Sequence, residues 1–448
     1  MLLNKERLKA FLEKAKKVSD QAELYLISKQ QLKIDVINQK IESIDELEEA
    51  GLSVRLITKS RPGFAYTADL DDAAIDDSIE QAARNAAAGS ADEWMDLPGA
   101  EEQKAKMELV DPDLASVSLI DKKALALDVE RFAMTYDKRI KRAEKTSYQE
   151  DLLTTVLINS KGVDVEYKKA ICGAFTEVIA EENGLMETGS WLTYSTRYNQ
   201  LDAASIGGEA GARAVAMLGA SQEVSGRAPV VLEPYVGSMI LSMMSPALSA
   251  EYAQKGKSLF ISARGKSVAS KKVTLVDSGV LQDGLATIPY DDEGVPTMET
   301  IIIKDGTFTD FLFNRRSANK AKRGSTGNAI RSSFKVQPEI LPTNLFIKPG
   351  HRTRDDLIGG ISKGFLVTTI MGAHTINPIS GDFSIGFSGH YIENGKIARP
   401  VRGMTIAGNL VDLLSRIEDV GSDLMFFPLA GNIGTPSLLI SGLSVSGL

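Results

Sequence analysis

Residues that could support metal or nucleophilic chemistry are scarce in this chain of 448 residues. It contains three histidines, His351, His374 and His390, and one cysteine, Cys172. A single cysteine cannot form an internal disulfide, and no pair of Cys-x-x-Cys segments exists for a structural zinc. Cys172 lies in an apolar run, which predicts a buried and unreactive thiol. Metal and thiol chemistry therefore begin with very few ligands.

Two of the histidines lie in one glycine-rich segment. His374 and His390 stand sixteen positions apart and could meet across a hairpin as two ligands of a metal ion. The alternative is a histidine that is hydrogen-bonded within a β-domain, and the pattern favours this alternative because a two-histidine site still needs a third ligand.

An acidic turn offers a second place for a cation. Asp291, Asp292 and Glu293 follow one another before Gly294, and hard cations prefer several carboxylate oxygens. The alternate-ligand spacing of a calcium loop is absent, so the sequence favours a solvated turn over a metal site.

The overall charge argues against nucleic acid as a direct partner. The chain has 51 Lys+Arg and 59 Asp+Glu, a formal charge of -8, and no cluster of basic residues. Charged residues interrupt the N-terminus, and no stretch approaches the roughly 18 uncharged apolar residues of a membrane span. We therefore expect a cytoplasmic, soluble protein with no membrane contact.

The elements that must position these residues change in character near residue 222. Helical periodicity predicts helices at 4–18, 71–88, 118–136 and 201–218, with strand-like runs between the members of each pair. Helix, several antiparallel strands and helix thus occur twice. This order predicts either two similar modules, 1–110 and 111–222, or one sheet built from both halves.

The second half of the chain, 223–448, reads as mainly β. Asp305-Gly306 and Asn394-Gly395 each separate two apolar runs, as in hairpins closed by a two-residue turn. Helices are expected only at 237–255 and 405–420. The predicted fold class is α+β: helices packed on antiparallel strands in 1–222, followed by a mainly-β domain.

Several stretches, taken in order, resemble the TldD/TldE family, also known as PmbA-like modulators of DNA gyrase. The similarity runs nearly end to end and is densest after Pro229. The stretches are 147–151, 256–260, 289–296, 325–328, 377–387, 391–396, 408–414 and 420–424.

The resemblance implies a cytosolic complex of two related subunits that degrades or trims peptides. In the TldD-type subunit, a helix carries His-Glu-x-x-x-His and a cysteine near the C-terminus completes a zinc site. The zinc lowers the pKa of a bound water, and the glutamate can accept its proton.

This sequence departs from that pattern at the zinc ligands. Counting back from Gly256, Leu241 and Pro246 replace the two histidines and Ser242 replaces the glutamate. The C-terminal loop 427–432 contains no cysteine. The resemblance thus implies a non-catalytic, TldE/PmbA-type subunit with no cofactor of its own, whose zinc-bearing TldD-like partner cleaves the peptide.

For such a subunit we expect a cavity that holds unfolded or small peptides, with an extended peptide added to a sheet edge. The candidate lining residues are Glu251, Asp291, Asp292, His374 and Asp382, and for each a turn or interface role is an equal alternative. A homodimer could form in isolation. Two other functions stay open: a self-sufficient homodimeric metallopeptidase with an atypical site at His374, His390 and Asp382, and a non-enzymatic protein-binding modulator of DNA gyrase.

Overall fold

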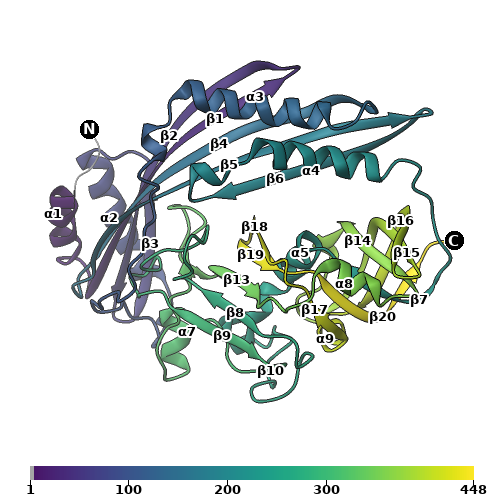
Figure 1. The fold of residues 1–448 in the computed structure, drawn as a ribbon. Helices are drawn as coiled ribbons and strands as arrows, with labels where there is room; N and C mark the ends of the chain where they lie inside the picture. The colour runs from purple at the N-terminus through teal and green to yellow at the C-terminus, as the bar shows by residue number, and fades with distance from the viewer. Residues whose placement is uncertain (1–4) are drawn as a thin grey trace.

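A long, curved antiparallel sheet forms the first unit of the protein, and a β-rich second unit packs against its concave face (Figure 1). The computed structural model describes residues 5–448. We call residues 5–218 the first unit and residues 226–448 the second unit. None of the helices within 5–448 has the length and apolar character needed to cross a membrane.

The first unit is one six-stranded sheet in the order β3-β2-β1-β4-β5-β6, so strands from both halves of the unit share it. Its two central strands, β1 and β4, pair antiparallel and join the halves. Of the two predicted arrangements, the structure has the single sheet. Its strands are β1 (Gln21–Ile37), β2 (Lys40–Thr58), β3 (Arg61–Thr67), β4 (Ile140–Asn159), β5 (Asp164–Glu182) and β6 (Leu185–Ser195).

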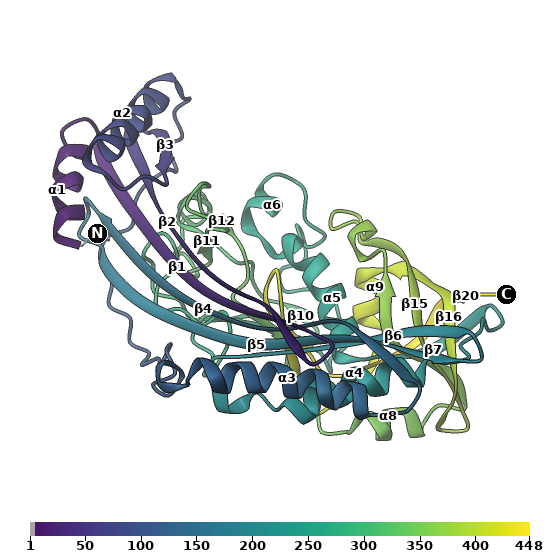
Figure 2. The ribbon, with the colours of Figure 1, turned by 90° about the horizontal axis from the view of Figure 1, so that it is seen from above.

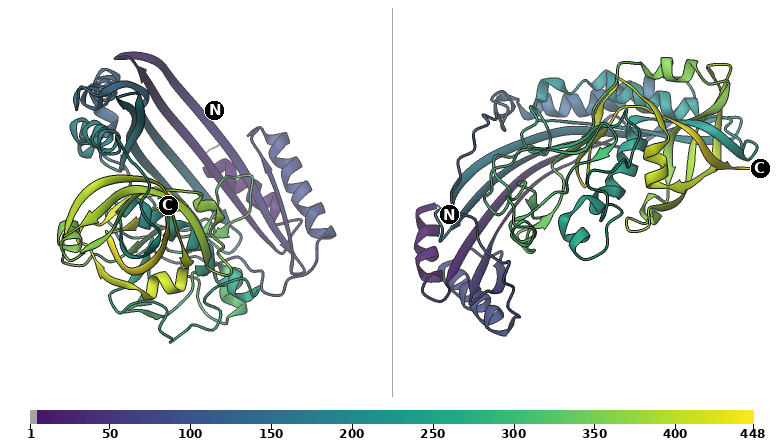
Figure 3. Two further views of the ribbon diagram at one scale, coloured as in Figure 1. Left: turned by 90° about the vertical axis from the view of Figure 1, so that its right-hand side faces the viewer. Right: turned by 90° about the horizontal axis from the view of Figure 1, so that it is seen from below.

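Four helices cover one face of this sheet, near the predicted positions (Figure 2). Neighbouring residues of a strand point to opposite faces. On β1, Leu24 and Leu26 therefore pack under the helices, while Tyr25 points to the second unit. Figure 3 shows the helices and the second unit on opposite sides of the sheet. The helices are α1 (Lys5–Ala15), α2 (Asp72–Ala88), α3 (Leu119–Thr135) and α4 (Ala203–Ala216).

The second unit contains two six-stranded sheets around one apolar core. The first has the order β10-β9-β8-β13-β19-β18 and the second β16-β15-β14-β7-β20-β17. Their strands are β7 (Gly226–Leu232), β8 (Leu275–Ser278), β9 (Glu299–Lys304), β10 (Thr307–Phe308), β13 (Asn344–Ile347), β14 (Lys363–Met371), β15 (Asp382–Glu393), β16 (Lys396–Asn409), β17 (Ile417–Val420), β18 (Met425–Leu429), β19 (Gly431–Thr435) and β20 (Leu438–Ser446). A further short pair is β11 (Ala329–Ile330) and β12 (Glu339–Ile340). The predicted α+β class with a β-rich second half is confirmed.

Both predicted hairpin turns are confirmed. Asp305-Gly306 joins β9 to β10 and Asn394-Gly395 joins β15 to β16, with positive φ at all four residues. This backbone conformation suits Gly and Asn or Asp, and its twist matches that of the flanking strands.

The helices of the second unit differ from the prediction. The helix expected at 237–255 ends at Met244, and a 3₁₀ turn at Ser245–Leu248 follows, because Pro246 cannot continue the hydrogen-bond ladder. The expected helix at 405–420 is wrong: Thr405 to Asn409 continue β16, and only a short helix precedes β17. The observed helices are α5 (Pro234–Met244), α6 (Ala250–Gln254), α7 (Arg315–Lys320), α8 (Arg354–Gly359) and α9 (Leu410–Ser415).

A buried ionic network fastens the two units to each other. Glu23 and Arg55 face each other across β1 and β2, and the Arg55 Nη2 donates to Glu23 Oε2 at 2.7 Å. From the second unit, Arg331 Nη2 donates to Glu23 Oε1 at 2.5 Å, and Glu293 Oε1 accepts from Arg55 Nη1 at 2.8 Å. All four side chains are at most 3% exposed. Charges this deep are tolerated only because each has partners.

Replacing Arg331 with Met should weaken this junction. The substitution removes one cation from Glu23 and leaves Ser53 Oγ without its 2.8 Å donor. We expect Arg331→Met to lower the free energy of unfolding by about 3 kcal/mol in urea denaturation. As a control, Arg84→Met removes an exposed helical pair with Glu80 and should change stability by no more than about 0.5 kcal/mol. Equal effects of the two substitutions would contradict a stabilising role for the network.

Candidate functional site

A cavity of about 570 Å³ lies between the concave face of the sheet and the second unit. Strands β1, β4, β5 and β6 form one wall, and loops of the second unit together with β11, β18 and β19 form the other. Its lining includes Tyr25, Asp151, Tyr167, Lys169, Ile171, Tyr194, Asp292, Arg331 and Asn432. The cavity therefore exists only where the two units meet.

Aromatic and polar groups alternate along the sheet wall. The ring of Tyr25 lies under the guanidinium of Arg331, with 4.6 Å between the ring centroid and Cζ. Burial and the nearby Asp292 raise the pKa of Tyr25 well above its usual value, so the phenol stays protonated. Asp151 accepts from Gln31 Nε2 at 2.7 Å and pairs with Lys29 at 3.2 Å. This wall thus offers fixed rings and hydrogen-bonding groups.

Of the five predicted cavity residues, Asp292 lines this cavity. Its Oδ2 accepts from the backbone N–H of Arg331 at 2.7 Å, and the side chain is 6% exposed. Burial raises the pKa of Asp292 to about 6, against the lowering effect of Arg331. The predicted solvated turn is wrong at 291–293, since all three acidic residues are buried against the first unit or within the loop.

Asp291 adjoins the cavity in sequence but serves its own loop. Its two carboxylate oxygens accept from the backbone N–H groups of Glu293, Val295 and Ala329 at 2.9–3.1 Å. Burial and Glu293 nevertheless raise the pKa of Asp291 well above the usual carboxyl range. This carboxylate holds the turn that presents Asp292.

The other three predicted residues lie outside the cavity lining. Glu251 in α6 accepts from Asn314 at 3.1 Å and pairs with Arg316 at 3.7 Å. His374 is exposed, and the exposed Asp382 accepts from Asn409 at 3.0 Å. These contacts are structural or lie at the surface.

The histidines do not assemble a metal site. His390 is partly buried in β15, which lowers its pKa, and its Nδ1 has no partner. Within residues 5–448 there is no group of three or more His, Cys, Asp or Glu side chains arranged to hold a metal ion.

The positions predicted for the zinc motif are occupied by groups that do not fit zinc. Leu241 is 3% exposed and packs in the apolar core with Leu413 and Leu438, while Pro246 offers no ligand atom. Ser242 Oγ accepts from the backbone N–H of Ala430 at 3.4 Å. This contact brings α5 against the hairpin of β18 and β19, as the resemblance requires. The available donor there is a hydroxyl, a poor zinc ligand.

Asn432 occupies the hairpin where a cysteine would complete that site. It is 2% exposed, and its Nδ2 donates to Asn344 Oδ1 at 2.9 Å. Its own Oδ1 has no partner, although the residue lines the 570 Å³ cavity. Asn432 therefore leaves an unused hydrogen-bond acceptor at the cavity wall.

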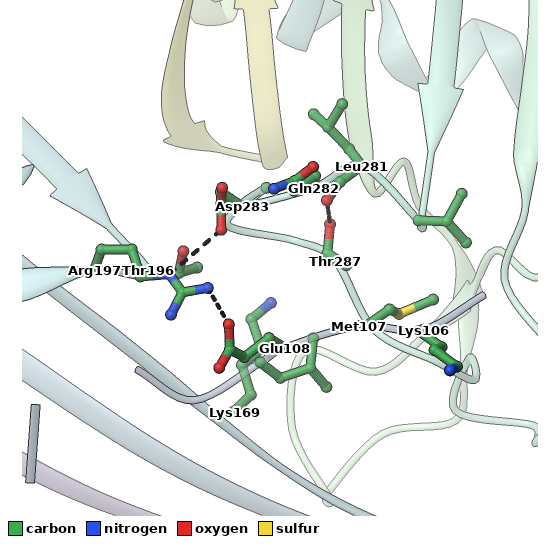
Figure 4. Close-up of a pocket in the computed structure, with 13 residues that line it drawn as sticks. Lys106, Met107, Glu108, Lys169, Thr196, Arg197, Leu281, Gln282, Asp283 and Thr287 are labelled. Carbon is green, nitrogen blue, oxygen red and sulfur yellow. Dashed lines mark hydrogen bonds and ion pairs between the residues drawn. The ribbon is translucent and has the colours of Figure 1, made fainter. Parts of the chain in front are cut away.

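A second cavity of about 380 Å³ adjoins the first (Figure 4). Its lining comes from Lys169 of β5, from Thr196 and Arg197 just after β6, and from the loop 280–287. Residues 106–109, in the segment that connects α2 to α3, complete it. Lys169 lines both cavities. The backbone N–H of Ala170 donates to the Leu109 carbonyl at 2.9 Å, which holds the connecting segment beside Lys169.

Lys169 is the residue that our sequence reasoning missed. It is 7% exposed, and among residues 5–448 its ammonium has neither an ion pair nor a hydrogen bond. Burial alone lowers its pKa to about 7. A signal was available: Lys168 and Lys169 are adjacent in a strand, so one of them must point to the covered face.

The protein is thus a two-unit α+β protein with a cavity between its units. Comparison of its sequence with models of protein families identifies the family. Residues 22–86 match the description "PmbA/TldA metallopeptidase domain 1", residues 112–218 match the central domain and residues 225–447 match the C-terminal domain. The chain belongs to the PmbA/TldD metallopeptidase family.

Relatives that carry the names PmbA, TldD and TldE are all similar to this chain. Metalloprotease PmbA of Escherichia coli O157:H7 is 28% identical over 447 residues, which cover 99% of this chain and 96% of the relative. The metalloprotease TldD homolog of Haemophilus influenzae is 26% identical, covering 89% and 87%. The solved structure of TldE from Thermococcus kodakarensis matches with a TM-score of 0.89 at 22% identity, covering 98% and 100%, and shows the same fold.

The buried Lys169 should make stability depend on pH. Its pKa is 10.5 in the unfolded chain and about 7 in the folded chain, so protonation favours unfolding. This cost is complete below pH 7 and vanishes as pH rises toward 10.5. We expect Lys169→Met to raise the free energy of unfolding at both pH values, by about 3 kcal/mol more at pH 6.5 than at pH 9.5.

The matched control for this measurement is Lys168→Met, which changes the exposed neighbour on the same strand. Urea denaturation of this variant should differ from that of the unchanged chain by about 0.5 kcal/mol or less at both pH values. A gain for Lys169→Met that does not decline as pH rises would contradict the lowered pKa of Lys169 in the folded chain.

Proposed function

We propose that this chain is the zinc-free subunit of a two-subunit PmbA/TldD-type peptidase. In this assembly it holds an extended peptide in the 570 Å³ cavity, and a TldD-like chain supplies the metal. The observation that carries the proposal is the set of groups at Leu241, Ser242 and Pro246, which cannot hold zinc beside a hairpin that carries Asn432. Family membership gives the class of reaction.

The chemistry of the cavity supports a peptide as its occupant. An extended peptide presents main-chain N–H and C=O groups on two edges, and both need partners when buried. Lys169 gives the cavity a cation without an ion pair, and Asn432 of the same lining has a buried Oδ1 without a hydrogen-bond partner. The rings of Tyr25, Tyr167 and Tyr194 provide apolar surface for side chains of varied size.

The location of the cavity also supports a holding role. Its walls come from both units, and the Glu23, Arg55, Glu293 and Arg331 network fixes their separation. A preformed cavity orders a flexible peptide with little rearrangement of the protein, so less binding energy is lost on closure.

Filling the cavity should test this role. Ile171→Trp adds a large ring to the sheet wall, and Leu185→Trp places the same ring on an exposed position of the same sheet. Each variant is mixed with a purified zinc-bearing TldD-type relative. We expect the cavity variant to lower kcat/KM for a fluorogenic peptide about tenfold, a loss of about 1.4 kcal/mol. The surface variant should stay within about twofold of the unchanged chain.

Sedimentation of the same mixtures checks association separately from cleavage. The proposal predicts that the unchanged chain, Ile171→Trp and Leu185→Trp each form a complex with the relative. It also predicts that metal analysis finds no zinc on the purified unchanged chain. It is contradicted when the unchanged chain neither associates with the relative nor alters its cleavage. Stoichiometric zinc that survives washing of the pure chain would instead favour a self-sufficient enzyme.

A further inference from the structure

Two buried polar groups without partners face the 380 Å³ cavity. Lys169 is 7% exposed and Thr196 is 4% exposed, and both line this cavity. The Thr196 Oγ1 has no hydrogen-bond partner, and Lys169 has no carboxylate within ion-pair distance. Leaving such groups unsatisfied costs free energy, so a site of this kind is suited to a ligand that completes their bonds.

The charged groups of Arg197, Glu108 and Asp283 in this cavity are already paired with one another, and Lys106, the other lysine of the lining, is exposed. Arg197 pairs with Glu108 at 2.5 Å and with Asp283 at 3.5 Å, as Figure 4 shows. A third carboxylate, Asp111, lies 3.9 Å from the same guanidinium. Among the residues of 5–448 that line this cavity, Lys169 is therefore the buried cation without a carboxylate partner.

This balance selects the charge of the ligand. One ammonium and one hydroxyl match a single negative charge with two oxygen acceptors, which is a carboxylate. A dianion such as phosphate would also meet the carboxylates of Glu108 and Asp283 at the same cavity. Met107, Leu109 and Leu281 form apolar walls that suit a carbon chain next to the charged end.

We propose that Lys169 and Thr196 form a binding site for a carboxylate group of the peptide. Lys169 donates charge-assisted hydrogen bonds to it, and the Thr196 hydroxyl donates one more. The inference rests on the proposed peptide-holding function and deepens it. Because Lys169 lines both cavities, a peptide in the 570 Å³ cavity can bring its carboxylate to the ammonium of Lys169.

Paired peptides test the site on the isolated full-length chain. Fluorescence anisotropy compares a short labelled peptide that ends in a free carboxylate with the same peptide ending in an amide. We expect the free acid to bind about tenfold more tightly, as one charge-assisted contact predicts. A third peptide with an amide end and one internal Glu separates a terminal carboxylate from an acidic side chain.

Substitutions then assign the preference to residues. Lys169→Met should abolish the tenfold preference, and Thr196→Val, which keeps the side-chain shape, should reduce it about threefold. Lys168→Met should leave it intact. Denaturation curves of each variant confirm folding, and because binding to the amide peptide should persist, loss of the preference is separable from loss of the fold.

The outcomes also separate this inference from the proposed function. Equal affinity for acid and amide peptides overturns the carboxylate site and leaves the peptide-holding role standing. Failure to bind any of the three peptides overturns both. A preference that survives Lys169→Met overturns the assignment to Lys169.

Discussion

The buried pairing of Glu23 with two guanidinium groups is the constraint on which the rest of the architecture depends. Arg55 lies opposite Glu23 in the sheet, and Arg331 approaches from the second unit. Removing these charges from water is costly, and only a close set of opposite charges compensates. Burial lowers the pKa of Arg55, but Glu23 and Glu293 raise it further, so the guanidinium remains charged. The two units can therefore dock in one register, in which every member of the network finds its partner.

That register also creates the cavities. Asp292 and Arg331 belong both to the docking loops and to the wall of the larger cavity. The segment 89–118 connects the two halves of the first unit and is hydrogen-bonded to the second unit. Arg316 donates to Asp92 at 2.5 Å, and Gln103 donates to the Pro289 carbonyl at 2.7 Å. The last part of this segment closes the smaller cavity near Leu109. The two cavities thus result from the polar contacts between the units, which hold the cavity walls apart. The large apolar cores lie within each unit and not between them.

The sequence allowed much of the fold to be predicted but little of the cavity. The four helices of the first unit and the two hairpin turns follow from local periodicity and turn chemistry, which act within a few residues. The helix expected at 405–420 failed because its apolar residues were buried by sheet pairing with β15 and β20, a nonlocal contact. Nonlocal contacts also decide which residues line the cavity. Residue type alone suggests Glu251, His374 and Asp382, which lie outside the lining. Of the predicted candidates, Asp292 lies in the lining of the larger cavity. Lys169 is not among them, although the adjacent Lys168 and Lys169 must point to opposite faces of their strand.

Buried cations in this protein fall into two kinds, and the difference separates structure from binding. Arg55 and Arg331 have their carboxylates within the chain, so their fixed fork geometry serves docking. Lys169 lies on the same concave face with no carboxylate beside it, and burial alone lowers its pKa to about 7. At that value the folded chain interconverts readily between charged and neutral lysine, and an arriving carboxylate would favour the charged form. A ligand can therefore provide the carboxylate partner that Lys169 lacks, as Glu23 does for the two arginines. The free-energy cost of burying Lys169 is already present in the unliganded protein.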